Sequence, residues 1–184
     1  MYGFTPEDIF LKVVNSKRKM HMSAEELREI FDHFPKDRLM TARFEDFYIN
    51  KPYVSNKELG ERIVRQQAGK DFYIPSSDEV EEYFSTHALL SKKCYQDLET
   101  FLIRHLKMDV GEAVCIVLEL WDRTFEEEDT HDVIQWFGDL FEFDNEAQVN
   151  EVLPLLMAAM NGTNLLRNRG YAPAHVPSTA DDVL

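Results

Sequence analysis

The sequence predicts an all-α protein, a single irregular bundle of about eight helices around a buried central helix at about residues 110–122. Two observations lead to this fold class. Apolar side chains recur at helical spacing through most of the 184 residues, and residues 109–122 leave almost no polar face, which is typical of a helix inside a fold. Asp109 followed by Glu112 has the spacing of a capping box at the start of that helix.

Length and composition indicate one soluble body. With 44% hydrophobic residues the chain can bury one sizeable core. We expect a single helical domain over residues 1–172, in which 1–70 could form a looser subdomain beside a core unit at 71–172, followed by a flexible tail at 173–184. The apolar runs are too short for a bilayer and no signal peptide is recognisable, which favours a cytoplasmic protein without membrane association.

The N-terminal part is predicted to form four helices. Pro6, followed by two acidic residues, is a typical helix start. Ser23 with Glu26 is a capping box that opens the second helix. Residues 40–48 carry apolar side chains at helical spacing, although the end of this stretch could be extended. A fourth helix follows at 55–69. The basic cluster Lys17–His21 suits a helix C-terminus better than a phosphate-binding role.

The remaining elements are also predicted to be helical. Amphipathic stretches occupy 76–87, 91–106, 131–141 and 145–160. His87 is interpreted as a half-buried core residue. Pro154 should kink or break the last helix, because its ring removes a hydrogen bond and crowds the preceding turn. Cys94 and Cys115 lie on apolar stripes, so we expect two buried thiols in a reducing compartment.

The net charge of −14 is concentrated in one stretch. Residues 122–151 hold eleven acidic residues and a single basic one, Arg123. Such a field repels nucleic acid and anionic lipid, and it favours a basic protein partner, although a simple solvated face also explains it. The candidate acidic surface consists of Glu126, Glu127, Glu128, Asp129 and Asp132.

A polar run follows the last long helix, from Asn161 to Pro173 (NGTNLLRNRGYAP). It resembles a segment of the form NNTRxWxNRGYTPxE found in uncharacterised bacterial helical proteins, where it often precedes a SEC-C motif, a short zinc-binding unit. The resemblance extends over about residues 70–173 and implies a helical fold and a bacterial origin, without an assigned activity. This chain has Gly162 where that family has a second Asn, Leu166 where it usually has Trp, and no cysteine after Cys115. The resemblance therefore implies no zinc site here.

The same run has two interpretations. As structure, Gly170 supplies a left-handed cap after two arginines, and the asparagines satisfy loose carbonyl groups. As function, a polar, cationic patch binds an anionic or peptide ligand. We favour the structural interpretation. The candidate binding residues are Asn161, Asn164, Arg167, Arg169 and Tyr171.

Signals for enzymatic chemistry are weak. Glu128 and His131 have the Glu-x-x-His spacing of di-metal bundles, but no second pair accompanies them. No phosphate-binding glycine loop or nucleophile elbow occurs. We therefore predict no catalytic residues, metal or cofactor. A non-catalytic helical module for protein interaction or regulation is the favoured function. The alternatives are an acidic inhibitor that mimics nucleic acid and binds a basic protein, and a nuclease-like hydrolase with a dispersed site. The sequence leaves the partner and the oligomeric state open.

Overall fold

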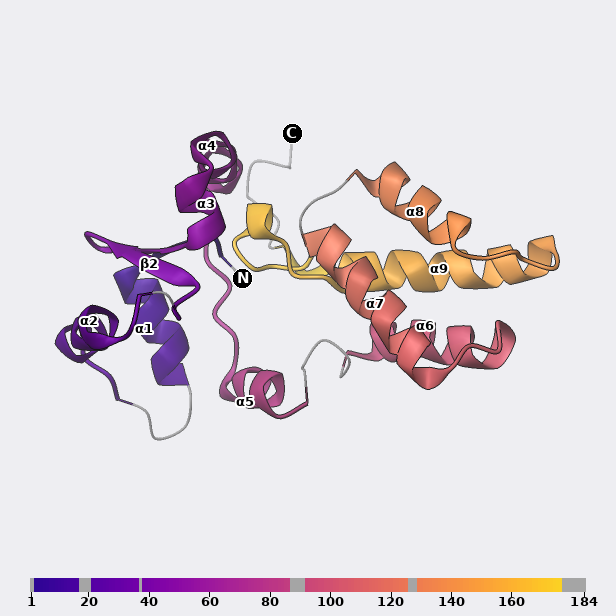
Figure 1. The fold of residues 1–184 in the computed structure, drawn as a ribbon, viewed down its shortest axis with the longest axis horizontal. Coiled ribbons are helices and arrows are strands. Elements are labelled where there is room, and N and C mark those ends of the chain that lie inside the picture. The colour runs from indigo at the N-terminus through magenta and orange to yellow at the C-terminus, as the bar shows by residue number, and fades with distance from the viewer. Residues whose placement is uncertain (1, 17–20, 37, 87–91, 126–128, 177–184) are drawn as a thin grey trace, which may run out of the picture. The chain divides into compact units, whose positions relative to one another are not determined.

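The computed structural model describes residues 2–16, 21–36, 38–86, 92–125 and 129–176, and the fold is predominantly helical, as predicted (Figure 1). The chain forms two compact units. Unit 1 comprises Met1–Glu81 and Leu166–Gly170, and unit 2 comprises Glu82–Leu165 and Tyr171–Leu184. The single domain over residues 1–172 stays a prediction.

Unit 1 contains a small antiparallel sheet that the sequence analysis missed. Its strands are β1 (Phe4–Pro6), β2 (Thr41–Phe44) and β3 (Phe47–Asn50), in the order β1-β3-β2. The helix expected over residues 40–48 is therefore wrong. Two four-residue runs joined by a two-residue turn are too short for periodicity to separate strand from helix, and the residue after Phe44 turns the chain with a positive φ of 51°.

In the described part of the chain, five α-helices accompany this sheet. They are α1 (Glu7–Ser16), α2 (Ala24–His33), the short α3 (Lys51–Ser55), α4 (Lys57–Gln67) and α5 (Ser77–Thr86), which begins in unit 1. The predicted capping box at α2 is confirmed, because Ser23 and Glu26 each bind the backbone N–H of the other. Most of the basic cluster Lys17–His21, and also His87, lie outside the described residues.

An acidic side chain is buried between α1, α2 and the sheet. The Arg28 guanidinium donates two hydrogen bonds to Glu7, at 2.9 and 2.5 Å, and the Tyr48 hydroxyl lies 3.3 Å from the same carboxylate. The Arg28 hydrogen bonds hold the pKa of Glu7 below its usual range, although burial opposes them. Burial raises the pKa of Tyr48 to about 12, and its ring packs between Phe10 and Phe31.

Unit 1 is completed by a segment from far along the chain. The short 3₁₀ helix η2 (Leu166–Asn168) packs on α4. The buried Gln67 amide donates to the carbonyl groups of Tyr2 and Leu166, both at 2.7 Å. Lys70 donates to the Arg167 carbonyl at 2.8 Å. Residues 2, 67 and 166 are thus joined through one side chain.

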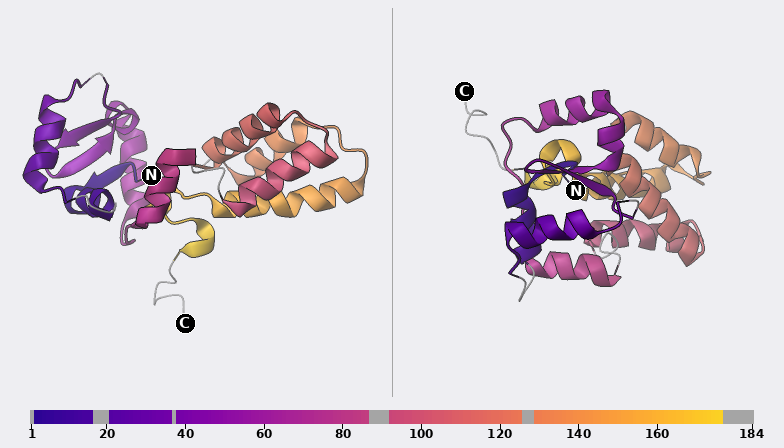
Figure 2. Two further views of the ribbon diagram at one scale, coloured as in Figure 1. Left: turned by 90° about the horizontal axis from the view of Figure 1, so that it is seen from below. Right: turned by 60° about the vertical axis from the view of Figure 1, so that its left-hand side comes forward.

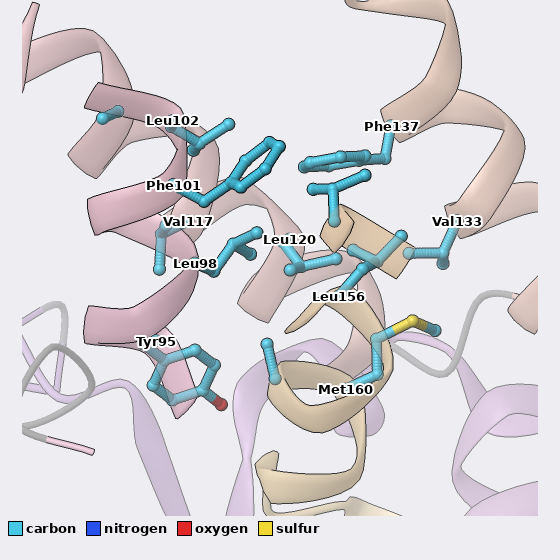
Figure 3. Close-up of a cluster of buried hydrophobic side chains, with 13 residues drawn as sticks. Tyr95, Leu98, Phe101, Leu102, Val117, Leu120, Val133, Phe137, Leu156 and Met160 are labelled. Atoms are coloured by element: carbon cyan, nitrogen blue, oxygen red, sulfur yellow. The ribbon is translucent and has the colours of Figure 1, made fainter. Parts of the chain in front are cut away.

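Unit 2 is a bundle of four helices, α6 (Lys93–His105), α7 (Val110–Phe125), α8 (Thr130–Asp139) and α9 (Glu146–Gly162). The views in Figure 2 show these helices, pink to orange, alongside one another. Their apolar faces meet in one core, and Figure 3 shows side chains from all four helices converging there, among them Leu98, Val117, Val133 and Leu156. The hydrophobic effect of this shared burial holds the bundle together.

The predicted central helix exists, but it is buried along one face only. In α7 the buried positions are Ala113, Val117, Leu120 and Thr124, while Val110 is exposed. Cys115 is exposed as well and Cys94 is only half-buried, so the expectation of two buried thiols is wrong. Three helices pack against one side of α7, which leaves its far side to solvent.

The end of unit 2 differs from expectation in two respects. Helix α9 continues through Pro154 without a break. Pro154 is solvent-exposed, and the alternative that it kinks the helix stays a prediction. The predicted flexible tail begins too early, because the 3₁₀ helix η3 (Pro173–His175) contacts α9. Residues 177–184 lie outside the described part of the chain.

The C-terminus of α9 fits closely against α6. A Cβ atom placed on Gly162 would lie 2.7 Å from the Cys94 sulfur, closer than van der Waals contact allows. Lys92 donates to the Gly162 carbonyl at 2.8 Å and to the Asn164 side chain at 2.6 Å. The absence of a side chain at Gly162 therefore lets α9 lie this close to Cys94.

Within the described ranges, no helix combines the length and the apolar character needed to cross a bilayer.

The buried carboxylate makes the stability of unit 1 depend on pH. Because the folded pKa of Glu7 is lowered, its contribution is present above the pKa of about 4.3 in the unfolded chain and is lost as pH falls through the folded pKa. Glu7→Gln should lower the free energy of unfolding at pH 7, and the difference from the parent should vanish in acid. Urea titrations across pH 2–7 measure this, with the exposed Glu29→Gln as control. A pH-independent difference would contradict the assignment.

The α6–α9 contact gives a second prediction. Gly162→Ala should destabilise unit 2 by about 1–3 kcal/mol, because the new methyl group overlaps the Cys94 sulfur. The matched control is Gly138→Ala in α8, where a Cβ meets nothing within 4 Å and helix propensity should add up to about 1 kcal/mol. In a Cys94→Ala background the cost of Gly162→Ala should largely disappear. Thermal unfolding of the four variants tests the contact, and equal effects in both backgrounds would refute it.

Candidate functional site

The two faces of the unit 1 sheet have different surroundings. The strand register places Thr5, Tyr48 and Arg43 side by side on one face. This face is covered by α1 and α2, because the Phe10 and Phe31 rings lie 4.6 and 4.7 Å from the Tyr48 ring. Side chains alternate along a strand, so the neighbouring residues must point to the opposite face.

The opposite face is only partly covered. It carries Phe4, Ile49 and Ala42, again side by side. Helix α3 covers the β1 side, where the Tyr53 ring lies 6.0 Å from that of Phe4. The β2 side remains open, and Phe44 at its end has 65% of its surface exposed.

The uncovered part of this face forms a groove with a volume of about 740 Å³. Its floor consists of sheet residues, namely Phe4, Ala42, Arg43, Phe44 and Ile49. Its wall consists of residues from α3 and α4, namely Tyr53, Val54, Lys57, Gly60, Glu61, Val64 and Arg65. Val54 and Val64 are 56% and 50% exposed, so the groove is apolar and open to solvent.

Charged groups stand on the wall of the groove. Three basic residues and one acidic residue, Glu61, line it. Lys57 lies 3.6 Å from Glu61, one helical turn away, and both are exposed. Arg43 turns toward the other sheet face, where its guanidinium contacts Asp32 at 3.0 Å. In a chain of net charge −14, this groove therefore carries a local excess of positive charge.

The arrangement is suited to binding. An apolar groove of this size that carries a few charges can hold side chains of a partner or a small ligand. Among the residues that the structure describes, no group of three His, Cys, Asp or Glu side chains is placed to hold a metal ion.

The predicted binding residues divide between the two units. Asn161, Asn164 and Tyr171 belong to unit 2, whereas Arg167 and Arg169 belong to unit 1. The Asn164 side chain accepts a hydrogen bond from Lys92 at 2.6 Å. Asn161 and Arg167 are exposed. Their role in ligand binding stays a prediction.

Arg169 has a clear structural role within unit 1. Its guanidinium lies 4.3 Å over the Phe72 ring and donates to the Lys70 carbonyl. Its own carbonyl accepts from the Tyr73 N–H at 3.0 Å. Arg169 and Gly170 both have positive φ, 47° and 87°, which confirms the expected left-handed turn. Burial lowers the pKa of Arg169, but an arginine stays charged at neutral pH.

The described part of the candidate acidic surface lies in unit 2. Asp129 caps α8 by accepting from the His131 N–H, and Asp132 is exposed in the first turn. Glu126, Glu127 and Glu128 lie outside the described residues. The other acidic side chains between residues 122 and 151 are exposed; they are Asp122, Asp139, Glu142, Asp144, Glu146 and Glu151.

Local sequence patterns did not predict the groove. Residues 41–44 and 47–50 are two short runs separated by Glu45 and Asp46, and this pair lacks the glycine or asparagine that is typical of a two-residue hairpin turn. The spacing of Phe44 and Tyr48 fits a helical face, although a spacing of four also fits one face of a strand. Val54 and Val64 carry no signal of their own.

Searches against profiles of known protein families, against curated proteins and against solved structures find no match to this chain.

The two interpretations of the Asn161–Pro173 run can be separated. Arg169→Ala should lower the free energy of unfolding by about 1–3 kcal/mol, because it removes the contacts with Phe72 and Lys70. Arg169→Lys should recover only part of the loss, since an ammonium group lacks the planar guanidinium that stacks on the ring. Arg62→Ala, at an exposed arginine of α4, should change the free energy of unfolding by no more than about 0.5 kcal/mol. Chemical denaturation decides, and equal effects of the two alanine variants would count against a structural role.

Proposed function

We propose that this protein is a non-catalytic helical module for protein interaction, and that the groove of unit 1 receives an apolar segment of a partner protein. The observation that carries this proposal is the exposure of Phe44, Val54 and Val64 around one groove. Burying apolar side chains is favourable, so their exposure to water costs free energy. Exposed apolar side chains that cluster on one surface therefore often mark a binding site.

The shape of the groove favours a polypeptide over a small molecule. It is open to solvent along the exposed residues Phe44, Val54 and Val64, whereas small-molecule sites usually enclose most of their ligand. We place the module in the bacterial cytoplasm, in line with its sequence resemblance and cysteine usage. A net charge of −14 argues against direct binding to nucleic acid.

The acidic stretch supports a second candidate, an inhibitor that mimics nucleic acid and binds a basic protein. Its described acidic side chains are exposed in unit 2, and its one basic residue, Arg123, is paired with Glu119 at 2.9 Å. Such a complex should lose affinity steeply as ionic strength rises. An interaction through the apolar groove should depend on salt only weakly. The nuclease-like alternative has no comparable observation in its favour.

Site-specific photocrosslinking tests the proposed function. A photoreactive benzoylphenylalanine at position 44 should capture a discrete partner protein from a lysate of the source cells, because this side chain lies in the groove. The same residue at position 34 provides the control. Phe34 is also an exposed aromatic of unit 1, but it caps the C-terminus of α2, a helix that covers the other face of the sheet, and it does not line the groove. Crosslinking products that are the same from both positions, or none from position 44, would contradict the proposal.

A further inference from the structure

The outer edge of strand β2 carries backbone groups suited to a further strand. β2 is an edge strand, and within the described ranges only β3 pairs with it. The Lys51 N–H donates to the Met40 carbonyl at 2.9 Å, which makes residues 40 and 51 a hydrogen-bonded pair. Such pairs alternate along an antiparallel ladder, so Ala42 and Phe44 bind β3 while Thr41 and Arg43 direct N–H and C=O outward.

The other side of the sheet confirms this alternation. The Asn50 N–H donates to the Gly3 carbonyl at 3.0 Å, so Asn50 turns its backbone toward β1. Its neighbours in β3, Ile49 and Lys51, must therefore turn toward β2. The hydrogen bonds from Lys51 to Met40 and from Asn50 to Gly3 thus give the same alternation. In both cases the N–H and C=O groups of Thr41 and Arg43 point away from β3.

The groove is continuous with this edge. Ala42, Arg43 and Phe44 are consecutive, yet all three line the groove. Ala42 and Phe44 share the sheet face that lines the groove, whereas the Arg43 side chain is held on the other face by Asp32. The backbone of Arg43, whose N–H and C=O are directed outward, is therefore the part of this residue that lines the groove. A strand laid along β2 would therefore place every second side chain in the groove.

The charged residues that line the groove determine which peptide sequences would bind there as a strand. Lys57 and Arg65 line the groove from α4, with Glu61 as the only acidic residue there. An edge strand is often protected by a charged side chain that blocks pairing. The charge on β2 belongs to Arg43, which is held on the opposite face by Asp32 at 3.0 Å. The groove side of the edge thus stays accessible and attracts carboxylates.

We infer that the partner segment is an extended peptide, rich in acidic and apolar residues, that adds as a strand to the outer edge of β2. Its main chain binds the outward N–H and C=O groups of Thr41 and Arg43, and its apolar side chains enter the groove. Its carboxylates lie near Lys57 and Arg65. This inference rests on the proposed function. It names strand addition rather than a docked helix, because a helix has no spare main-chain groups to pair with the edge.

Peptide selection followed by amide exchange tests the inference. A library of random eight-residue peptides displayed on phage is panned on the full chain, and the strongest binder is synthesised. Selected peptides should combine acidic and apolar residues. On binding, NMR should show slower hydrogen exchange at the amides of Thr41 and Arg43. The amides of Ala42 and Phe44, already bonded to β3, should change little. This alternating pattern is specific to strand addition.

Charge reversal supplies the second readout. Arg65→Glu should weaken binding of the selected peptide about three- to ten-fold, as expected for an exposed charge contact that becomes repulsive. Arg62→Glu is the matched control, because Arg62 is exposed on the same helix but does not line the groove. Equal effects of the two variants would remove the charge argument.

Several outcomes would overturn the inference. They are selection of basic peptides or of none, unchanged exchange at Thr41 and Arg43, a helical bound peptide, and protection that grows with protein concentration alone, which would assign the edge to a second copy of this chain. If any of these results is obtained while position 44 still crosslinks to a partner protein, the proposed function stands, but the groove binds something other than the acidic extended peptide. If position 44 also fails to crosslink, the proposed function itself is refuted.

Discussion

The buried Gln67 side chain is the constraint on which unit 1 depends. Its amide binds the carbonyl groups of both Tyr2 and Leu166, which lie 164 positions apart in the sequence. An unbonded buried amide is costly, so all three segments must be present for this arrangement to be stable. The bond fixes the C-terminal end of α4 and leaves the rest of its length beside the sheet. The groove therefore lies between α4, which is held at this end, and the sheet face of β2 that carries Ala42 and Phe44, which is only partly covered.

The distribution of charge separates the units. The described acidic side chains of residues 122–151 belong to unit 2 and are exposed to solvent, whereas Lys57 and Arg65 of unit 1 lie beside exposed apolar side chains. Cations beside apolar surface attract a ligand that offers both carboxylates and apolar groups. The net charge of the whole chain suggests a basic partner. The local positive charge at the groove instead favours an acidic segment of a partner.

The polar run after α9 illustrates how structure and binding compete as explanations. Arg169 stacks on Phe72 and binds Lys70, and the asparagine at 164 holds Lys92. These contacts account for much of the polar composition of the run, which in sequence could equally have served a ligand. Gly162 is also explained by packing, because the Cys94 sulfur occupies the space that a side chain at position 162 would need. A segment that looks like a binding motif can thus be explained by packing.

The sequence by itself determined the predominantly helical fold, the capping box at Ser23 and the left-handed turn at Gly170, because these features arise from contacts between residues close together in the chain. Only the tertiary structure decided the sheet, the one-sided burial of α7 and the groove. Phe44 and Val64 are brought together by the pairing of β2 with β3 and by the packing of α4. The sequence around Phe44 does not predict that it lies near Val64, and the sequence around Val64 does not predict it either. Contacts between residues far apart in the sequence depend on the free energy of the whole fold.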